Sequence, residues 1–220
     1  MAGNDVFIPA QIKVRKLRLG NARASWCLCP AGVSSKSVVY SFGVGNDLSF
    51  DLELTKQLGV RVHAFDPTPR SIEWVRSQLL PESIMFHSWG VAAHDGMARF
   101  NAPENLHHVS YTTFPSKTES GSSLEAPVYR IATIMRMLGH DRIDLLKMDI
   151  EGSEYEVIQD LLASRIYVDQ LLVEFHHRWR GIGIKQTRQA IKDLNNAGYR
   201  IFHVSASGEE YSLRLSRSAV

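Results

Sequence analysis

The sequence predicts an α/β fold in which a mainly parallel β-sheet carries helices on both faces. From Val38 onward, short runs rich in β-branched and aromatic residues alternate with longer segments of helical periodicity. This alternation is typical of parallel sheets whose strands are connected by helices. The final apolar runs, 199–205 and 210–216, flank Gly208 and predict a closing antiparallel hairpin.

Length and composition indicate one soluble globular domain. A chain of 220 residues with 44% hydrophobic and 22% charged residues is ordinary for this class. A formal charge of +2 is too small to indicate a nucleic-acid partner by itself. No segment approaches the roughly 18 apolar residues of a membrane span, and residues 1–20 lack the apolar core of a secretory signal. We therefore expect a soluble, cytoplasmic protein with no membrane partner.

The cysteines agree with that location. Cys27 and Cys29 are the two cysteines of the chain, and they alternate along an apolar run. Alternate strand residues point to opposite faces, which suits neither a disulfide nor a shared metal. We expect two free thiols and a reducing compartment.

Residues 1–36 are predicted to be an N-terminal extension. The segment 12–19, "IKVRKLRL", roughly alternates apolar and basic residues, which predicts an edge strand with a basic outer face. The basic strip at 13–18 suits either solvent or an acidic partner such as a nucleic acid, and we expect it to be solvated.

The next elements follow in a regular βαβαβ order. Strands are predicted at 38–42, 60–65 and 83–88, and helices at 47–58 and 69–80. Phe50, Leu54 and Leu58 share one face of the first helix, which Gly59 ends, and Pro69 opens the second helix.

The middle of the chain is less regular. Residues 91–100 predict a hairpin around an Asp-Gly turn. Residues 101–127 lack periodicity and predict a long loop, which suits either a substrate lid or a surface excursion. Regular structure is predicted to resume at 128–138, with strands at 143–150 and 169–175 and helices at 153–162 and 184–197. Ser153 and Glu156 have the spacing of a capping box for the helix at 153–162.

The first βαβ unit resembles a nucleotide-binding element. Gly43 and Gly45 follow the first strand directly, and Asp66 comes 21 positions after Gly45 at the end of the second strand. Ligands of parallel sheets bind beyond the carboxyl ends of the strands, where glycine permits close backbone approach. Asp66 is placed to accept hydrogen bonds from ribose hydroxyls.

The identity of the cofactor follows from what the unit lacks. Leu48 stands where a dinucleotide fingerprint has its third glycine, and no Gly-Lys-Ser/Thr string follows. S-adenosylmethionine has a ribose and no phosphate, and its carboxylate suits the free N–H groups at the start of the 47–58 helix. Trp89, Gly90 and Val91 follow the third strand, where an adenine would bind; the alternative is that Trp89 fills the core.

A second polar cluster falls on the same sheet edge. Lys147, Asp149 and Glu151 alternate around one strand end, and Glu174, His176 and His177 follow another. A buried strand does not tolerate such charges unpaired, so they line a polar site or form a structural Lys–Glu or His–Glu network.

Four strings, "VVYSFGVGNDLSFD", "VHAFDPTP", "LLKMDIEGSEYEVI" and "LLVEFHH", resemble the motifs of the FkbM family of methyltransferases over about residues 38–215. The resemblance implies a class I, Rossmann-like, doubly wound, seven-stranded domain over 37–220. It also implies S-adenosylmethionine as methyl donor and a small-molecule hydroxyl acceptor, such as a sugar or natural product, with Asp149 and Glu151 at the active site. The expected cofactor-binding residues are Ser41, Phe42, Gly43, Val44, Gly45, Asn46, Asp66, Pro67, Trp89, Gly90, Val91 and Asp149.

Methyl transfer to a hydroxyl needs a group that takes its proton. His176 is the first candidate because imidazole titrates near neutral pH, and Asp149 is the second, unless it holds the amino group of the cofactor. Glu174 is placed to orient His176 or His177. A divalent ion bridged by Asp149, Glu174 and His176 is chemically possible, but the spacing does not require one and we expect none.

Two other functions fit parts of the sequence. An NAD(P)-dependent oxidoreductase would share the βαβ unit, but Leu48 argues against it. A non-catalytic or nucleic-acid-directed binding protein would use the basic strip at 13–18. The chain lacks the Asn/Asp-Pro-Pro-Tyr string of many base methylases, and its aromatic residues are not interleaved with Lys and Arg. We therefore expect no nucleic-acid partner.

Overall fold

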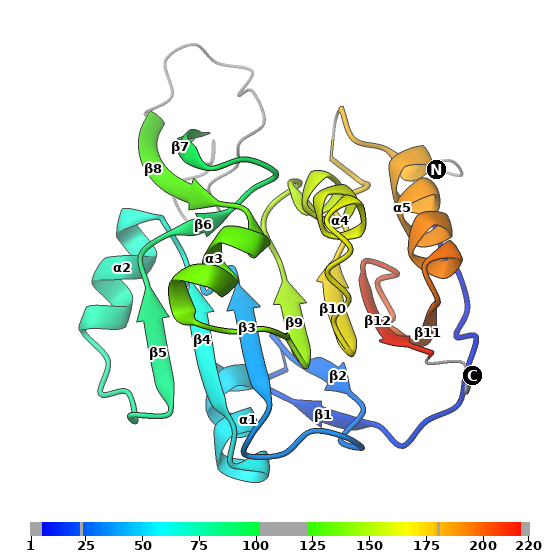
Figure 1. Ribbon diagram of the computed structural model, residues 1–220, viewed down its shortest axis with the longest axis horizontal. Helices are drawn as coiled ribbons and strands as arrows, with labels where there is room; N and C mark the ends of the chain where they lie inside the picture. The colour runs from blue at the N-terminus through cyan, green and yellow to red at the C-terminus, as the bar shows by residue number, and fades with distance from the viewer. Residues whose placement is uncertain (1–5, 23, 102–122, 180, 217–220) are drawn as a thin grey trace.

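The computed structural model describes residues 6–22, 24–101, 123–179 and 181–216, and its largest feature is a seven-stranded sheet (Figure 1). The strand order across the sheet is β11-β12-β10-β9-β3-β4-β5. In chain order the strands are β3 (Val38–Phe42), β4 (Arg61–Phe65), β5 (Ile84–His87), β9 (Leu145–Met148), β10 (Gln170–Glu174), β11 (Tyr199–Val204) and β12 (Glu210–Leu215).

The sheet is parallel except at its C-terminal end. The pairs β3–β4, β4–β5, β3–β9 and β9–β10 are parallel, whereas β12 runs antiparallel to both β10 and β11. The chain moves outward from β3 to β5 and then returns to β9 on the other side of β3. Such a reversal opens a crevice at the carboxyl ends of β3 and β9. The predicted fold class, including the antiparallel C-terminal hairpin, is confirmed.

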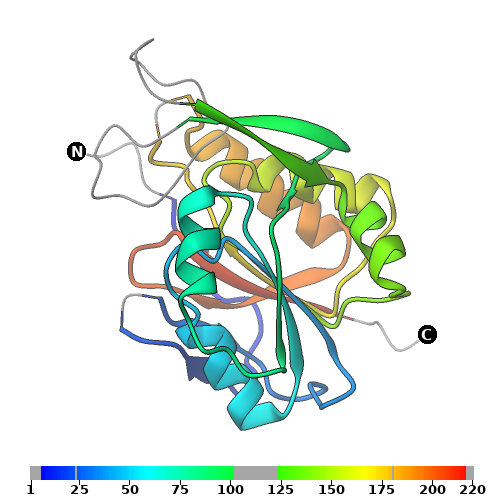
Figure 2. The same cartoon turned by 90° about the vertical axis from the view of Figure 1, so that its left-hand side faces the viewer.

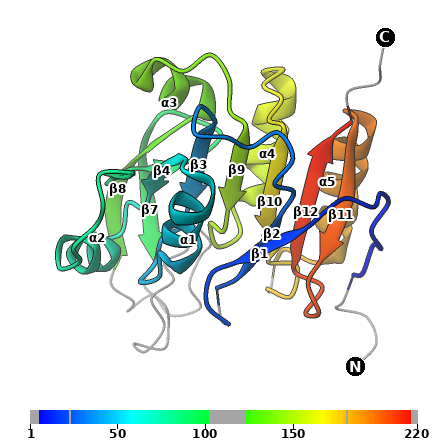
Figure 3. The ribbon, with the colours of Figure 1, turned by 90° about the horizontal axis from the view of Figure 1, so that it is seen from below.

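Helices cover both faces of this sheet, as the view from below shows (Figure 3). On one face, α3 (Ile131–Leu138), α4 (Glu154–Ala163) and α5 (Ile184–Asn196) bury an apolar core that includes Ile134, Ile158 and Ile191. On the other face lie α1 (Ser49–Leu58) and α2 (Pro69–Arg76), with Phe50, Leu54 and Val75 buried. The apolar spacing at three and four residues explains why these helices turn one face inward.

The helix ends agree with the sequence in part. Gly59 takes the left-handed conformation (φ 66°) that ends α1, and α2 begins at Pro69, as predicted. However, α2 ends at Arg76 rather than at residue 80. The predicted capping box is wrong, because the side chain of Ser153 makes no capping hydrogen bond to α4. No helix within the described ranges is long and apolar enough to cross a membrane.

The N-terminal segment packs on the sheet face that carries α1. The predicted edge strand at 12–19 is reduced to β1 (Leu17–Leu19), which pairs with β2 (Trp26–Leu28) in a separate two-stranded sheet. Leu19, Trp26 and Leu28 are buried in the core beneath them. The amide side chain of Gln170 on β10 hydrogen-bonds both the backbone N–H and the backbone oxygen of Cys29 at 2.8 Å. This segment is therefore an integral layer of the fold.

Both cysteines of this segment are free and buried, as predicted.

A third sheet lies across the carboxyl ends of the main strands (Figure 2). It contains β6 (Gly90–Val91), β7 (Gly96–Asn101) and β8 (Ser123–Tyr129), with β8 in the middle. The predicted hairpin at 91–100 is wrong, since β6 and β7 each pair with β8 and not with each other. Asp95 accepts hydrogen bonds from the backbone N–H of Arg130 and the hydroxyl of Thr133, which anchors this corner to α3. Of the predicted loop at 101–127, residues 123–127 belong to β8, and 102–122 lie outside the described residues.

A core substitution tests whether the N-terminal segment belongs to the fold. Leu28→Ala should lower the free energy of unfolding by about 2–5 kcal/mol, because it leaves a cavity in a packed layer. Urea unfolding followed by circular dichroism measures this change. The fully exposed Leu79→Ala should stay within about 0.5 kcal/mol of the wild type. Equal stability of the two variants would show that residues 17–28 do not pack as described.

Candidate active site

A pocket of about 580 Å³ lies at the carboxyl ends of β3, β4, β9 and β10. The loop from Phe42 to Asp47 forms its floor, residues of β7 and β8 cover it, and Ala24, Ser25 and Trp26 form one wall. This is the crevice that the strand order creates. Of the predicted site residues, those that line the pocket are Phe42, Gly43, Val44, Gly45, Asn46, Asp66, Pro67, Gly90, Val91, Asp149, Glu151 and Glu174.

Ser41, Trp89 and His176 were predicted at the site but lie behind the pocket wall. Ser41 is buried in β3. Trp89 is partly buried and packs edge-on against the rings of Phe65, His87 and Tyr129 at the edge of the core. His176 lies behind Asp149 and Glu151.

The loop after β3 is pressed against the end of β9. A Cβ atom on Gly43 would lie 1.7 Å from the backbone oxygen of Asp149, and the φ angle of Gly43 is +82°. No other residue fits this position. Gly45 also has a positive φ, +56°, but a Cβ atom there would meet no atom within 4 Å. The two predicted glycines therefore have different roles, close contact at Gly43 and backbone conformation at Gly45.

Asp66 connects the glycine loop to the next helix. Its Oδ2 accepts a hydrogen bond from the backbone N–H of Gly45 at 2.9 Å. Its Oδ1 accepts hydrogen bonds from the backbone N–H of Thr68 at 2.9 Å and from the Thr68 hydroxyl at 2.6 Å. A carboxylate offers about four acceptor positions, so Asp66 retains capacity for about one further donor, such as a ribose hydroxyl.

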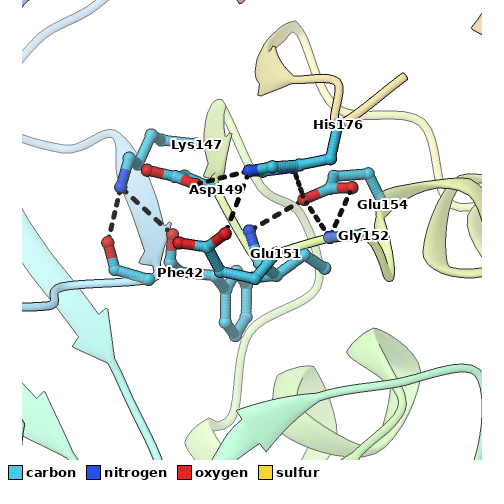
Figure 4. Close-up of polar contacts among 9 residues, drawn as sticks. Phe42, Lys147, Asp149, Glu151, Gly152, Glu154 and His176 are labelled. Carbon is cyan, nitrogen blue, oxygen red and sulfur yellow. Dashed lines mark hydrogen bonds and ion pairs between the residues drawn. The ribbon is translucent and has the colours of Figure 1, made fainter. Parts of the chain in front are cut away.

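Lys147 holds the loop from below. Its ammonium group is buried and donates hydrogen bonds to the backbone oxygens of Phe42 at 3.2 Å and Gly43 at 2.7 Å (Figure 4). The ring of Trp26 lies 5.3 Å away. Burial raises the pKa of nearby Asp51 to about 6, and the positive charge of Lys147 opposes that rise.

His176 lies at the centre of three carboxylates (Figure 4). Its Nδ1 lies 3.0 Å from Oε1 of Glu154, and its Nε2 lies 3.2 Å from Oε2 of Glu151 and 3.8 Å from Oδ1 of Asp149. Glu154 is fully buried and also accepts hydrogen bonds from the backbone N–H groups of Ile150 and Gly152. Glu151 has a positive φ of 54°, an uncommon conformation that turns its carboxylate toward His176.

This environment changes the prediction made for His176. Burial by itself would lower its pKa, but the hydrogen bonds that its N–H groups donate to Glu151 and Glu154, and the negative charges of these residues, outweigh burial and raise the pKa to about 11. An imidazole that is already protonated at neutral pH cannot accept a proton from a substrate. The geometry therefore does not favour His176 as the general base.

The pKa values of two carboxylic acids beside His176 are raised as well, in their case by burial. Burial raises the pKa of Asp149 to about 6, with Lys147 opposing the rise and Glu151 adding to it. Burial and the charge of Asp149 raise the pKa of Glu174 to about 8. Asp149 and Glu174 line the pocket and, like Asp51, titrate close to neutral pH.

The pocket is strongly acidic. Among the described residues that line it, Arg99 and Lys147 carry a permanent positive charge. Its carboxylates are those of Asp47, Asp51, Asp66, Asp149, Glu151, Glu156, Glu174 and Glu210. This excess of negative charge favours cationic or hydroxyl-rich ligands and disfavours phosphates.

Several lining residues were not predicted from the sequence. Asp47 and Asp51 stand at the start of the 47–58 helix, where sequence reasoning considered only N–H groups. Glu210 reaches the pocket because β12 inserts beside β10, and Trp26 does so because the N-terminal segment folds back over the sheet. Neither placement has a local signal in the sequence.

Comparison with known proteins gives one family. The family model described as the methyltransferase FkbM domain matches residues 38–201. The probable methyltransferase-like protein 24 of Rattus norvegicus and that of Homo sapiens are 25% and 24% identical to this chain over 176 residues. These matches cover 75% of this chain and 42% of each relative, so the chain spans less than half the length of the curated relatives it matches.

A solved structure of another protein aligns with most of this chain. A crystal structure of methyltransferase FkbM from Methylobacillus flagellatus KT aligns with 82% of this chain and 44% of that chain, with a TM-score of 0.49 and 14% sequence identity.

A matched pair of glycine substitutions tests the contact between the β3 loop and β9. Gly43→Ala should lower the free energy of unfolding by at least about 3 kcal/mol, because its methyl group overlaps the Asp149 backbone oxygen. Gly45→Ala adds no contact and should cost about 1–2 kcal/mol for its left-handed backbone. Chemical denaturation of both variants measures the difference. A Gly43→Ala protein as stable as Gly45→Ala would contradict the described contact.

Proposed function

We propose that this chain, which belongs to the FkbM methyltransferase family, transfers the methyl group of S-adenosylmethionine to a hydroxyl oxygen of a small molecule. The observation that carries the proposal is the acidic pocket at Gly43, Gly45 and Asp66. S-adenosylmethionine carries a sulfonium and an ammonium group and a ribose. Each of these features suits a carboxylate-lined pocket.

The residues present fit the adenosyl part of the donor. Asp66 has acceptor capacity for a ribose hydroxyl. Pro67, Gly90 and Val91 line the adjacent wall. A Cβ atom on Gly90 would lie 3.1 Å from side-chain atoms of Pro67 and Val128, so the wall is already tightly packed there. These residues support an adenine between Asp66 and the covering sheet.

The charged groups at the amino-acid end of the donor take the opposite placement to the one expected from the sequence. The backbone N–H of Ser49 is used by Oδ1 of Asp47 at 2.7 Å, and Asp51 is buried one turn further along. An anion at this helix start would meet two carboxylates. We therefore place the ammonium group of the donor, rather than its carboxylate, near Asp47 and Asp51.

The same charges weigh against the two rival functions. NAD(P) carries a diphosphate, which the excess of carboxylates would repel. Leu48, which occupies the place of a third glycine, is buried in the core and leaves no close approach for a diphosphate. A nucleic acid would bring further phosphates to this acidic surface.

Methyl transfer is an in-line displacement, and the protein contributes chiefly by positioning. The acceptor oxygen forms a bond to the methyl carbon, the bond from that carbon to sulfur breaks, and the acceptor proton passes to a base. We assign Glu174 in its ionised form as that base, because it lines the pocket, whereas His176 lies behind Asp149 and Glu151. His176 then orients these two carboxylates. The ionised fraction of Glu174 grows as the pH rises toward its pKa of about 8, so turnover should increase over this range.

The acceptor site lies between Glu174, Glu210 and the wall formed by Ser25 and Trp26. Carboxylates accept hydrogen bonds from hydroxyl groups, and the accessible edge of the largely buried Trp26 ring offers an apolar contact to a sugar ring or similar scaffold. This combination supports a neutral, polyhydroxylated acceptor.

Isothermal calorimetry with S-adenosylhomocysteine tests the donor. The wild-type chain should bind S-adenosylhomocysteine and not NAD. Asp66→Ala should weaken binding about 10- to 100-fold, because a hydrogen bond to a charged group contributes about 1.5–3 kcal/mol. The exposed Asp141→Ala should bind as the wild type does. Binding of NAD with no binding of S-adenosylhomocysteine would refute the methyltransferase proposal.

Transfer of a labelled methyl group to a panel of sugars and hydroxylated natural products tests the base. Glu174→Gln should lower turnover about 10²- to 10⁴-fold, since the acceptor proton loses its acceptor. Its affinity for S-adenosylhomocysteine should change far less. The exposed Glu82→Gln serves as the matched control. Wild-type turnover by Glu174→Gln would remove this residue from the mechanism.

A further inference from the structure

We propose that Asp149, Glu151 and His176 form a binding site for one divalent cation of the first transition row. From the sequence we expected no metal, and the ion considered there would have been bound by Asp149, Glu174 and His176. In the structure, Glu151 instead of Glu174 completes the group, and one donor atom from each residue lies within 4.8 Å of the other two. Two of the ligands therefore come from the segment after β9, and the third comes from the segment after β10.

The spacing of the donor atoms suits a single ion. Nε2 of His176 lies 3.2 Å from Oε2 of Glu151 and 3.8 Å from Oδ1 of Asp149. Ligands that bind one ion at about 2.0–2.2 Å and at right angles are about 3 Å apart, and opposite ligands are about 4 Å apart. All three donor atoms lie within 4.8 Å of one another, close to the separations that one ion requires.

A carboxylate behind the histidine prepares it as a ligand. Nδ1 of His176 lies 3.0 Å from Oε1 of Glu154, which is itself fixed by the backbone N–H groups of Ile150 and Gly152. Binding of the ion displaces the proton of Nε2, while Nδ1–H continues to donate to Glu154. The lone pair of Nε2, which faces Asp149 and Glu151, then binds the ion. This arrangement of carboxylate, histidine and open nitrogen is the usual support of metal-binding histidines.

Oδ1 of Asp149 accepts no hydrogen bond from the described residues, which favours a metal ion over a proton at this site. Nε2 of His176, Oε2 of Glu151 and Oδ1 of Asp149 point toward one another. Their lone pairs repel unless a proton or a metal ion lies between them. A proton on Nε2 satisfies Glu151 at 3.2 Å, but it leaves Oδ1 of Asp149 at 3.8 Å, solvent-inaccessible and without a hydrogen bond to any described residue. A metal ion contacts all three atoms at once. The imidazole is also buried, with 8% of its side chain exposed.

The chemistry of the donors indicates which ion. Two carboxylates and one imidazole suit Mn²⁺, Zn²⁺ or Fe²⁺ better than the oxygen-seeking Mg²⁺. Asp149 and Glu151 line the pocket, so an ion between them and His176 has its remaining positions directed at the acceptor site. There it would bind the acceptor oxygen and make its proton easier for Glu174 to remove, a role that rests on the proposed function.

Mn²⁺ titration of the full chain, purified in chelator and followed by electron paramagnetic resonance, tests the site. Wild-type protein should bind one Mn²⁺ per chain, with hyperfine coupling to a single ¹⁴N from the ligand imidazole. Glu151→Gln should weaken Mn²⁺ binding by about tenfold or more. Glu73→Gln, an exposed acid on α2, should leave it unchanged.

The outcomes separate this proposal from the proposed function. No Mn²⁺ binding by folded wild-type protein, or binding without ¹⁴N coupling, overturns the metal site even where S-adenosylhomocysteine still binds. Binding that Glu151→Gln does not weaken places the ion elsewhere and also overturns it. Mn²⁺ bound with ¹⁴N coupling and lost in Glu151→Gln supports the site, even if S-adenosylhomocysteine fails to bind. The ¹⁴N measurement needs only wild-type protein, so the test stands if Glu151→Gln does not fold.

Discussion

The site depends on the hydrogen bonds that the buried ammonium group of Lys147 donates to the loop after β3. A charge removed from water must find partners, and this one donates to the backbone oxygens of Phe42 and Gly43. These two carbonyls belong to the turn between β3 and α1, so the charge fixes the shape of the glycine loop. Asp51 and Asp149 supply compensating negative charge nearby. One side chain in the centre of the sheet thus holds the loop beneath the pocket.

Charge then decides what the pocket can take. The protein as a whole has a formal charge of +2, yet its pocket gathers carboxylates from α1, β9, β10 and β12. Crowding of like charges in a partly dry space stabilises any cation that enters. This excess of negative charge would stabilise both the proposed donor sulfonium and the proposed metal ion at His176. The same excess of carboxylates therefore supports both the proposed donor site and the proposed metal site.

Sequence reasoning succeeded where the determinants are local. β3 spans the predicted residues, and Gly59 ends α1, because hydrophobic runs and left-handed glycines act within a few residues. The predicted hairpin at 91–100 failed because the true partner, β8, lies far along the chain. The capping box failed because Glu154, inside the helix, binds the backbone N–H groups of Ile150 and Gly152.

The site shows the same division. The glycines and carboxylates stood at predictable strand ends, so their gathering could be foreseen. The protonation state of His176 could not be foreseen, because it depends on contacts with Glu151 and Glu154 that form across the turn before α4. The contact of Gly43 with the Asp149 carbonyl has a mechanical consequence. Because the backbone of Gly43 lies against the Asp149 carbonyl, these two turns form one continuous surface, and a change in either turn would be transmitted to the other.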